Sequence, residues 1–243
     1  MSIFRIQRQT PPVVLNLIIA NIVVFLAASL FESSMVRFQL FPLDVRVGAQ
    51  ALWREILSIN AVVDPTWNQA HFSFWQPFTY MFMHGGFSHL FFNMFSLWMF
   101  GRTLELELGS KRFLTYYIVC GVGAALFQMG VAQIDFATLE VGSRAWISYM
   151  QVPTVGASGA IFGLLLAFGL MHPNAMISLI FPPITLKAKW FVIIYGVLEL
   201  LLGVSGTMDS VAHFAHLGGM FWGWLLLVWW RHQARKNNNY YQY

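Results

Sequence analysis

Long apolar runs recur from one end of this chain to the other, and they restrict it to folds that keep most of its length in lipid. Only 10% of the 243 residues are charged, and the mean hydropathy is +0.61. A soluble domain carries about a quarter charged residues, and no polar block here is long enough to form one. We therefore expect an all-α, polytopic membrane fold.

Six apolar segments are predicted to cross the membrane as helices. They are residues 11–31, 87–104, 113–131, 158–171, 190–204 and 211–230. The hydrocarbon core needs about 20 residues, so the short fourth segment should hold its first residue below the membrane surface. The first segment also fits a signal peptide, but it is long for one, and we expect it to be retained as an anchor.

The predicted organisation has three parts. Residues 1–10 form a cytoplasmic N-terminus, 11–231 a six-span domain, and 232–243 a cytoplasmic C-terminal tail. Within the domain, the large first loop at about 32–82 mixes charged and aromatic side chains. That mixture is typical of segments that lie flat at the membrane interface.

Positive charge falls mainly on one side of this topology. Six spans put both termini on one side, and ten of the fourteen Lys and Arg residues lie there. By the positive-inside rule that side is the cytoplasm, so Ser158 and the start of the sixth span should be extracytoplasmic. This placement explains the net charge of +4 without nucleic acid as a partner. We expect a multi-pass protein of the cell (inner) membrane, with the lipid bilayer around it.

Ser158 stands among small residues at the start of the fourth span. A serine is a weak nucleophile until a base is delivered to it, and His216, in the sixth span, is expected on the same side of the membrane. We therefore expect Ser158 and His216 to be catalytic.

Two pairs of glycines would allow the fourth and sixth spans to pack closely. Gly159 and Gly163 are four residues apart, as are Gly219 and Gly223, so each helix has a small-residue face. Contact between these faces would bring His216 within reach of Ser158. Packing without any catalytic purpose is the alternative explanation of these glycines.

The second span supplies further polar side chains. His89 and Asn93 are four residues apart, hence on one helical face, and polar groups within a span usually face the protein interior. Together with the Ser158 N–H they would suit a developing oxyanion. We place His84 and Gly156 at the same site. Hydrogen bonding between helices for packing alone is the alternative for His89 and Asn93.

A metal site is the main chemical alternative for the histidines. His84, His89, His213 and His216 could converge, but the chain has no His-Glu-x-x-His run. Cysteine and carboxylate side chains are also absent beside the histidines. We therefore expect neither a metal nor another cofactor.

Three more residues are open to interpretation. Glu199 lies inside the fifth span and could be a proton or ion site, or a neutral structural acid. Asp209 could orient a histidine, but it is seven residues from His216, so a Ser-His dyad is preferred. Cys120 is the single cysteine, which excludes an intramolecular disulfide; its apolar surroundings predict a packing residue.

These motifs together resemble those of the rhomboid intramembrane serine proteases, in their minimal six-span form. The resemblance is carried by Gly156-Ala157-Ser158-Gly159 (the Gly-x-Ser-Gly motif), His216 with Gly219 and Gly223, His84 with His89 and Asn93, and Glu105 with Gly109 as a structural acid and glycine. Two positions depart from the family. Trp75-Gln76 stands where Trp-Arg is common, and Phe162 stands where some relatives have tyrosine.

The resemblance implies a protease that cleaves peptide bonds in or near transmembrane segments of other membrane proteins. It also implies a small residue before the scissile bond, and a lateral entrance at the second and fifth spans and the loop before His213. One alternative is an inactive rhomboid-like protein that binds transmembrane clients. Another is a small transporter, although the internal repeat typical of transporters is not found. The natural substrate and the oligomeric state do not follow from the sequence.

Overall fold

The structure is a computed structural model that describes residues 10–31, 35–40, 43–48, 74–140, 143–144, 154–179, 183–204 and 210–236. Most of the predicted interfacial loop at 32–82 lies outside these residues, as do Asp209, the first nine residues and the last seven.

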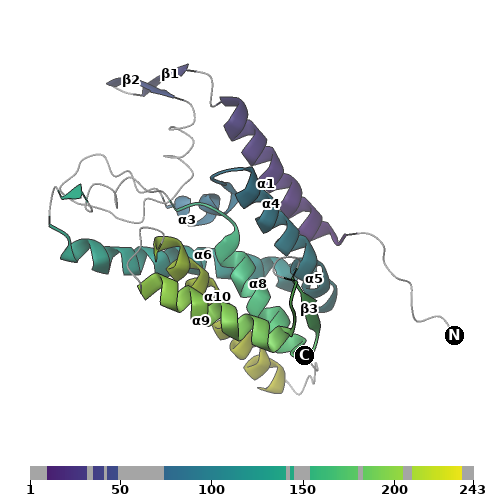
Figure 1. The fold of residues 1–243 in the computed structure, drawn as a ribbon. Helices are drawn as coiled ribbons and strands as arrows, with labels where there is room; N and C mark the ends of the chain where they lie inside the picture. The colour runs from purple at the N-terminus through teal and green to yellow at the C-terminus, as the bar shows by residue number, and fades with distance from the viewer. Residues whose placement is uncertain are drawn as a thin grey trace.

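Helices dominate the described part of the chain (Figure 1). The larger ones are α1 (Pro12–Phe31), α4 (Phe87–Ser96), α5 (Arg102–Leu108), α6 (Ser110–Thr138), α8 (Ser158–Met171), α9 (Ala188–Val204) and α10 (Ser210–Lys236). Short helical segments α3 (Gln76–Thr79) and η1 (Tyr80–Phe82) precede α4, and a π-helical turn, η2 (Leu97–Gly101), joins α4 to α5. Each of the six predicted apolar segments coincides with one of these helices or with the α4–η2–α5 unit.

Two short antiparallel strand pairs were not predicted. Strands β1 (Met35–Leu40) and β2 (Leu43–Gly48) pair with Met35 opposite Gly48, while β3 (Met176–Ser178) pairs with β4 (Thr185–Lys187) between α8 and α9. The fold is therefore predominantly helical rather than all-α. Three residues in each strand carry too little alternation for a sequence pattern to reveal β3 and β4.

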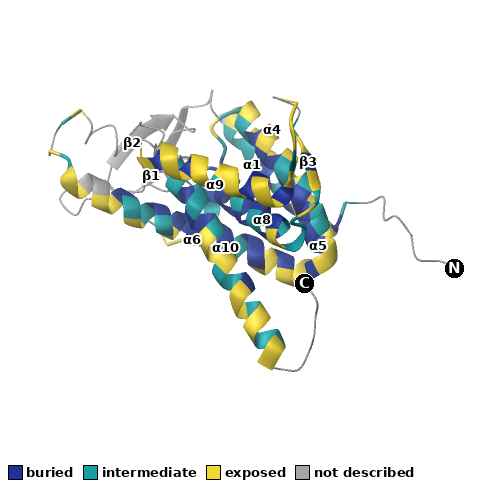
Figure 2. Ribbon diagram, turned by 60° about the horizontal axis from the view of Figure 1, so that its bottom comes forward, coloured by how far each residue is buried: buried dark blue, intermediate teal, exposed yellow. Residues whose placement is uncertain are grey.

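Among the residues that the structure describes, two helices are long and apolar enough to cross a membrane by length and composition, Pro12–Ser29 and Ser110–Ile134, and Ser158–Met171 is a shorter apolar helix. Large apolar side chains are exposed along α9, among them Ile193, Val197 and Leu201 at 52%, 51% and 61% (Figure 2). An extended apolar surface of this kind marks a face that meets lipid or a partner. The count of six crossings stays a prediction.

Helix α8 packs against α6, α9 and α10. More than half of its residues are buried, and it is apolar all round, as expected of a helix enclosed by others. Glycine makes the close approach possible: a Cβ on Gly219 would collide with the backbone carbonyl of Gly159, and one on Gly163 would lie 2.7 Å from Cβ of Cys120. The predicted faces of α8 and α10 thus meet at Gly159, Gly163 and Gly219. Gly223 instead faces Tyr116 and Cys120 of α6, where Cys120 is buried.

Glu105 of α5 links α1 to the rest of the bundle by hydrogen bonds. Its carboxylate accepts hydrogen bonds from the backbone N–H of Val13 and Val14 at 3.0 and 2.8 Å, and from Ser110 Oγ at 2.7 Å. The first N–H groups of a helix have no partner within the helix, so Glu105 acts as the N-terminal cap of α1. Gly109 follows α5 with φ of 77°, a conformation that favours glycine.

Candidate active site

Ser158 and His216 face each other across the packed helices α8 and α10. The His216 Nε2 and Ser158 Oγ atoms are 2.8 Å apart, within the range of a good hydrogen bond. Ser158 is the first residue of α8, and His216 lies in the second turn of α10. The distance arises from the close crossing described above, because larger residues than glycine would hold the two helices apart.

Glu199 of α9 completes a chain of polar contacts behind His216. Its Oε2 atom is 2.9 Å from Nδ1 of His216 and 2.6 Å from Nδ1 of His213. The sequence predicts Glu199 as a proton or ion site or a neutral structural acid, and it predicts a Ser-His dyad without this residue. Two signals were available: an ionisable residue within an apolar helix, and two histidines three residues apart, which therefore lie on one helical face.

Phe162, one turn after Ser158, covers the imidazole of His216. Its ring lies nearly parallel to the imidazole and also approaches Tyr195 of α9, with 6.0 Å between ring centroids. A phenyl ring thus stacks on His216 at the position where some relatives have tyrosine.

His89 of α4 lies against the backbone just before Ser158. A Cβ built on Gly156 would be 2.7 Å from His89 Nε2 and 3.8 Å from Ser158 Oγ, so glycine leaves the space that the imidazole occupies. Gly156 has φ of 117°, and its N–H donates to the carbonyl of Tyr80 at 2.9 Å. The residues before Ser158 are thereby held against η1.

Asn93 is buried and donates from Nδ2 to the backbone carbonyl of His89 at 2.8 Å. An amide NH₂ has two N–H donors, so one is left for another acceptor. Asn93 thus lies one turn after His89 on α4. One of the two N–H groups of the Asn93 amide is used in a hydrogen bond within this helix.

His84 lies in the turn before α4, its ring centroid 5.0 Å from that of His89. Burial, together with the neighbouring His89, lowers the pKa of His84 to about 4. Loss of hydration disfavours the charged imidazolium, so His84 is neutral near pH 7.

The predicted alternative of four converging histidines is not what the structure forms. Among the described residues, the group whose atoms could hold a metal is Glu199, His213 and His216, with all three ligand atoms within 4.8 Å of one another. His84 and His89 are not part of it. Direct hydrogen bonds already link its members.

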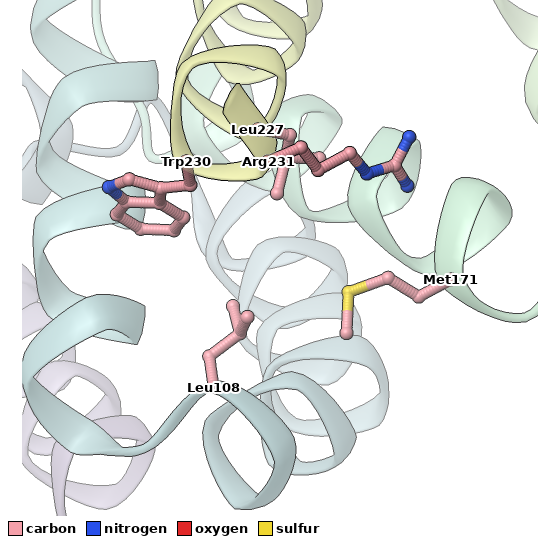
Figure 3. Close-up of a pocket in the computed structure, with 5 residues that line it drawn as sticks. All are labelled: Leu108, Met171, Leu227, Trp230 and Arg231. Atoms are coloured by element: carbon pink, nitrogen blue, oxygen red, sulfur yellow. The ribbon is translucent and has the colours of Figure 1, made fainter. Parts of the chain in front are cut away.

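A small hollow lies between α5, the C-terminal end of α8 and α10. Leu108, Met171, Leu227, Trp230 and Arg231 line it (Figure 3). It is separated from Ser158 by the length of α8, about 20 Å at 1.5 Å per residue. Its lining is mainly apolar, and we assign it no part in the chemistry at Ser158.

Comparison with known proteins indicates one family. The family model described as the rhomboid domain matches residues 71–233. The chain is 34% identical to RHOMBOID-like protein 5 of Arabidopsis thaliana, over 63% of this chain and 44% of the relative. It is 32% identical to the mitochondrial Rhomboid protein 1 of Saccharomyces cerevisiae, over 60% and 40%. It is also 26% identical to the rhomboid protease AarA of Providencia stuartii, over 88% and 70%. The chain spans less than half the length of the first two relatives.

Proposed function

Because this chain belongs to the rhomboid family, which is embedded in membranes, we propose that it is an intramembrane serine protease. The proposed reaction is hydrolysis of peptide bonds in or near transmembrane segments of other membrane proteins, by a Ser158–His216 pair. The observation that carries the proposal is the 2.8 Å separation of Ser158 Oγ and His216 Nε2 at the crossing of α8 and α10. A serine hydroxyl bonded to an unprotonated imidazole nitrogen is the arrangement that nucleophilic acyl transfer requires.

The reaction would proceed in two halves. Ser158 Oγ attacks the carbonyl carbon of the scissile bond while its proton passes to His216 Nε2. Collapse of the tetrahedral intermediate breaks the C–N bond, and the leaving amine takes that proton. Water then attacks the acyl-enzyme, with His216 again accepting and returning the proton, which releases the new carboxyl end and restores Ser158.

The negative oxygen of the intermediate needs hydrogen-bond donors. We assign this role to the backbone N–H of Ser158, to His89 and to the second N–H of Asn93. Gly156 makes room for His89. His84 shapes the space around the oxyanion site or holds a water molecule beside His89. Loss of one oxyanion donor typically costs on the order of 10²–10³ in rate.

The surroundings of the site are proposed from the sequence and the family. We propose a multi-pass protein of the cell membrane with six spans, both termini in the cytoplasm, and a site that opens on the extracytoplasmic side. The domain would extend over 11–231. Substrates would be single-pass or polytopic membrane proteins, and a segment must unwind locally before its peptide bond can reach Ser158. No cofactor is required for this chemistry.

A serine-reactive fluorophosphonate tests the proposal directly. We expect detergent-solubilised protein to be labelled, and Ser158→Ala and His216→Ala to abolish labelling and cleavage of a model transmembrane substrate. Ser178→Ala is a matched control, because Ser178 lies on β3 with its hydroxyl bonded to Thr185, and this variant should be labelled normally. Folded protein that is neither labelled nor cleaves the substrate would instead favour an inactive rhomboid-like protein that binds transmembrane clients.

A further inference from the structure

We infer that Glu199 is a positioning residue for His216 and that His213 holds Glu199 in place for that purpose. The inference rests on the proposed protease function and extends the preferred dyad into a group of four side chains from three helices.

The two histidines share one carboxylate oxygen. Glu199 Oε2 is within hydrogen-bond distance of Nδ1 of His216 and of His213, at 2.9 and 2.6 Å. The three side chains are largely enclosed, with exposed fractions of 10% for Glu199, 18% for His213 and 16% for His216. Contacts of this length, largely enclosed by protein, fix the orientation of the imidazole more firmly than surface contacts would.

The contact with Glu199 also selects the tautomer of His216. An ionised carboxylate can only accept hydrogen bonds, so Nδ1 of His216 must carry the proton. The lone pair of the neutral ring is then on Nε2, which faces Ser158 Oγ at 2.8 Å. When Nε2 takes the serine proton, the resulting imidazolium lies against the carboxylate, which stabilises it.

His213 lowers the free-energy cost of placing the Glu199 carboxylate within an apolar helix. An acidic group within an apolar helix is expensive unless it is paired, and a single N–H donor would leave Glu199 poorly satisfied. His213 and His216 are three residues apart on α10, so both rings reach the same side of the helix and both donate to Glu199. On this reading His213 acts on catalysis through Glu199.

A second glutamate–histidine pair gives a matched control. Glu107 of α5 and His172, which follows α8, approach to 2.9 Å. His172 lies at the opposite end of α8 from Ser158. The same chemical changes can therefore be made in a second, more exposed pair that has no access to the site.

The first experiment compares Glu199→Gln, Glu199→Asp and Glu107→Gln by the rate of fluorophosphonate labelling and by kcat and KM for a model transmembrane substrate. The Gln amide can donate to Nδ1 and so move the His216 proton to Nε2. We expect Glu199→Gln to lower kcat on the order of 10²-fold or more, since the corresponding Asn in a Ser-His-Asp triad costs about 10⁴. KM should change little, Glu199→Asp should restore part of the rate, and Glu107→Gln should match the wild type.

The second experiment tests His213 by retaining or deleting its donor. An Asn side chain can place Nδ2 near the position of the His Nδ1, whereas Leu cannot donate. We expect His213→Asn to keep most of the activity and His213→Leu to lose it. In the Glu199→Gln background, His213→Leu should lower the activity only a little further. The effects of substituting two residues that act through one another are not additive. His172→Leu is the control and should be fully active.

The outcomes separate the two proposals. If the wild type is not labelled, the proposed function fails and this inference falls with it. A second outcome is that the wild type is active and the Glu199→Gln variant folds with an unchanged kcat. In that case the inference alone is wrong, and Glu199 only links α9 to α10. Activity that is lost to a chelator and regained with zinc would also overturn it, because the three side chains would then hold a metal. Should Glu199→Gln not fold, a low-field His216 Nδ1–H proton signal in the wild type would support the tautomer assignment, and its absence from the wild type would contradict it.

Discussion

The ring of Phe162 lies parallel to the imidazole of His216, with 4.1 Å between the centroids and 6° between the planes. Ser158 approaches the same imidazole at one edge nitrogen and Glu199 at the other. The imidazole is therefore held at one face and at both nitrogens. Each of these contacts can be changed separately.

Replacing Phe162 by leucine should slow the reaction without abolishing it. Leucine keeps apolar volume but loses the parallel ring contact, and such ring pairs contribute about 0.5–1.5 kcal/mol beyond area burial. If that stabilisation holds the productive orientation of His216, kcat should fall by between about 2-fold and 10-fold. Phe162→Tyr keeps the ring and should retain the rate. Equal kcat values for the Leu and Tyr variants would contradict this role.

Gly156→Ala should impair catalysis more than folding. The new Cβ would lie 2.7 Å from Nε2 of His89, and the φ of 117° is strained for alanine. Displacement of one oxyanion donor is expected to cost on the order of 10²-fold in kcat. Gly86→Ala is the matched loop control, because no neighbouring atom lies within 4 Å of the added Cβ. A variant at 156 with wild-type kcat would remove His89 from the proposed oxyanion site.

Gly219→Ala should destabilise the bundle. Its Cβ would collide with the carbonyl of Gly159 and lie 2.7 Å from that carbonyl carbon, so α8 and α10 must move apart. Overpacking of this kind costs about 1–3 kcal/mol, which thermal unfolding in detergent would detect as a lower Tm. Gly130→Ala is the control, because its Cβ meets no neighbour within 4 Å and alanine favours the helix. A Tm for Gly219→Ala at or above that of Gly130→Ala would contradict the close crossing.

His84 should make stability fall on acidification. Its pKa is lowered to about 4 in the folded protein from an ordinary value of 6.5, so between these two values the unfolded chain binds the proton more readily. Its share of stability is fully present above pH 6.5 and is lost progressively toward pH 4. From pH 7 to pH 5 the wild type should lose about 2 kcal/mol more than His84→Gln. Equal losses in parallel unfolding titrations would show that His84 is not buried as described.

The helices of this fold were predictable because long apolar runs in a sequence indicate lipid-facing helices. The segment predicted at 158–171 coincides with α8, and the one at 190–204 begins two residues after α9 does. Hydropathy fixes where a helix lies but not its irregularities. The π-helical turn at 97–101 and the short strand pair β3–β4 depend on tertiary packing. No local sequence pattern therefore predicts them.

The site was predictable to the extent that its residues stand in recognisable local motifs. Ser158 and His216 each lie among small residues, and the structure brings them together at the predicted crossing. Glu199 lacked a motif of its own, since its partners lie 14 and 17 residues away on the next helix. Which face of α9 turns toward α10 depends on packing, which sequence periodicity alone does not give.

The cap that Glu105 places on α1 bears on where this protein can be divided. Sequence similarity to the family model begins at residue 71, well after α1 has ended. Yet Val14 and Leu17 of α1 are 0% and 7% exposed, and the Glu105 carboxylate has the backbone of α1 as its partner. A piece cut at residue 71 would expose that apolar surface and leave an acid among apolar side chains without its two N–H donors. The folding unit of this chain therefore includes α1, and the region that the family model matches is not by itself a module.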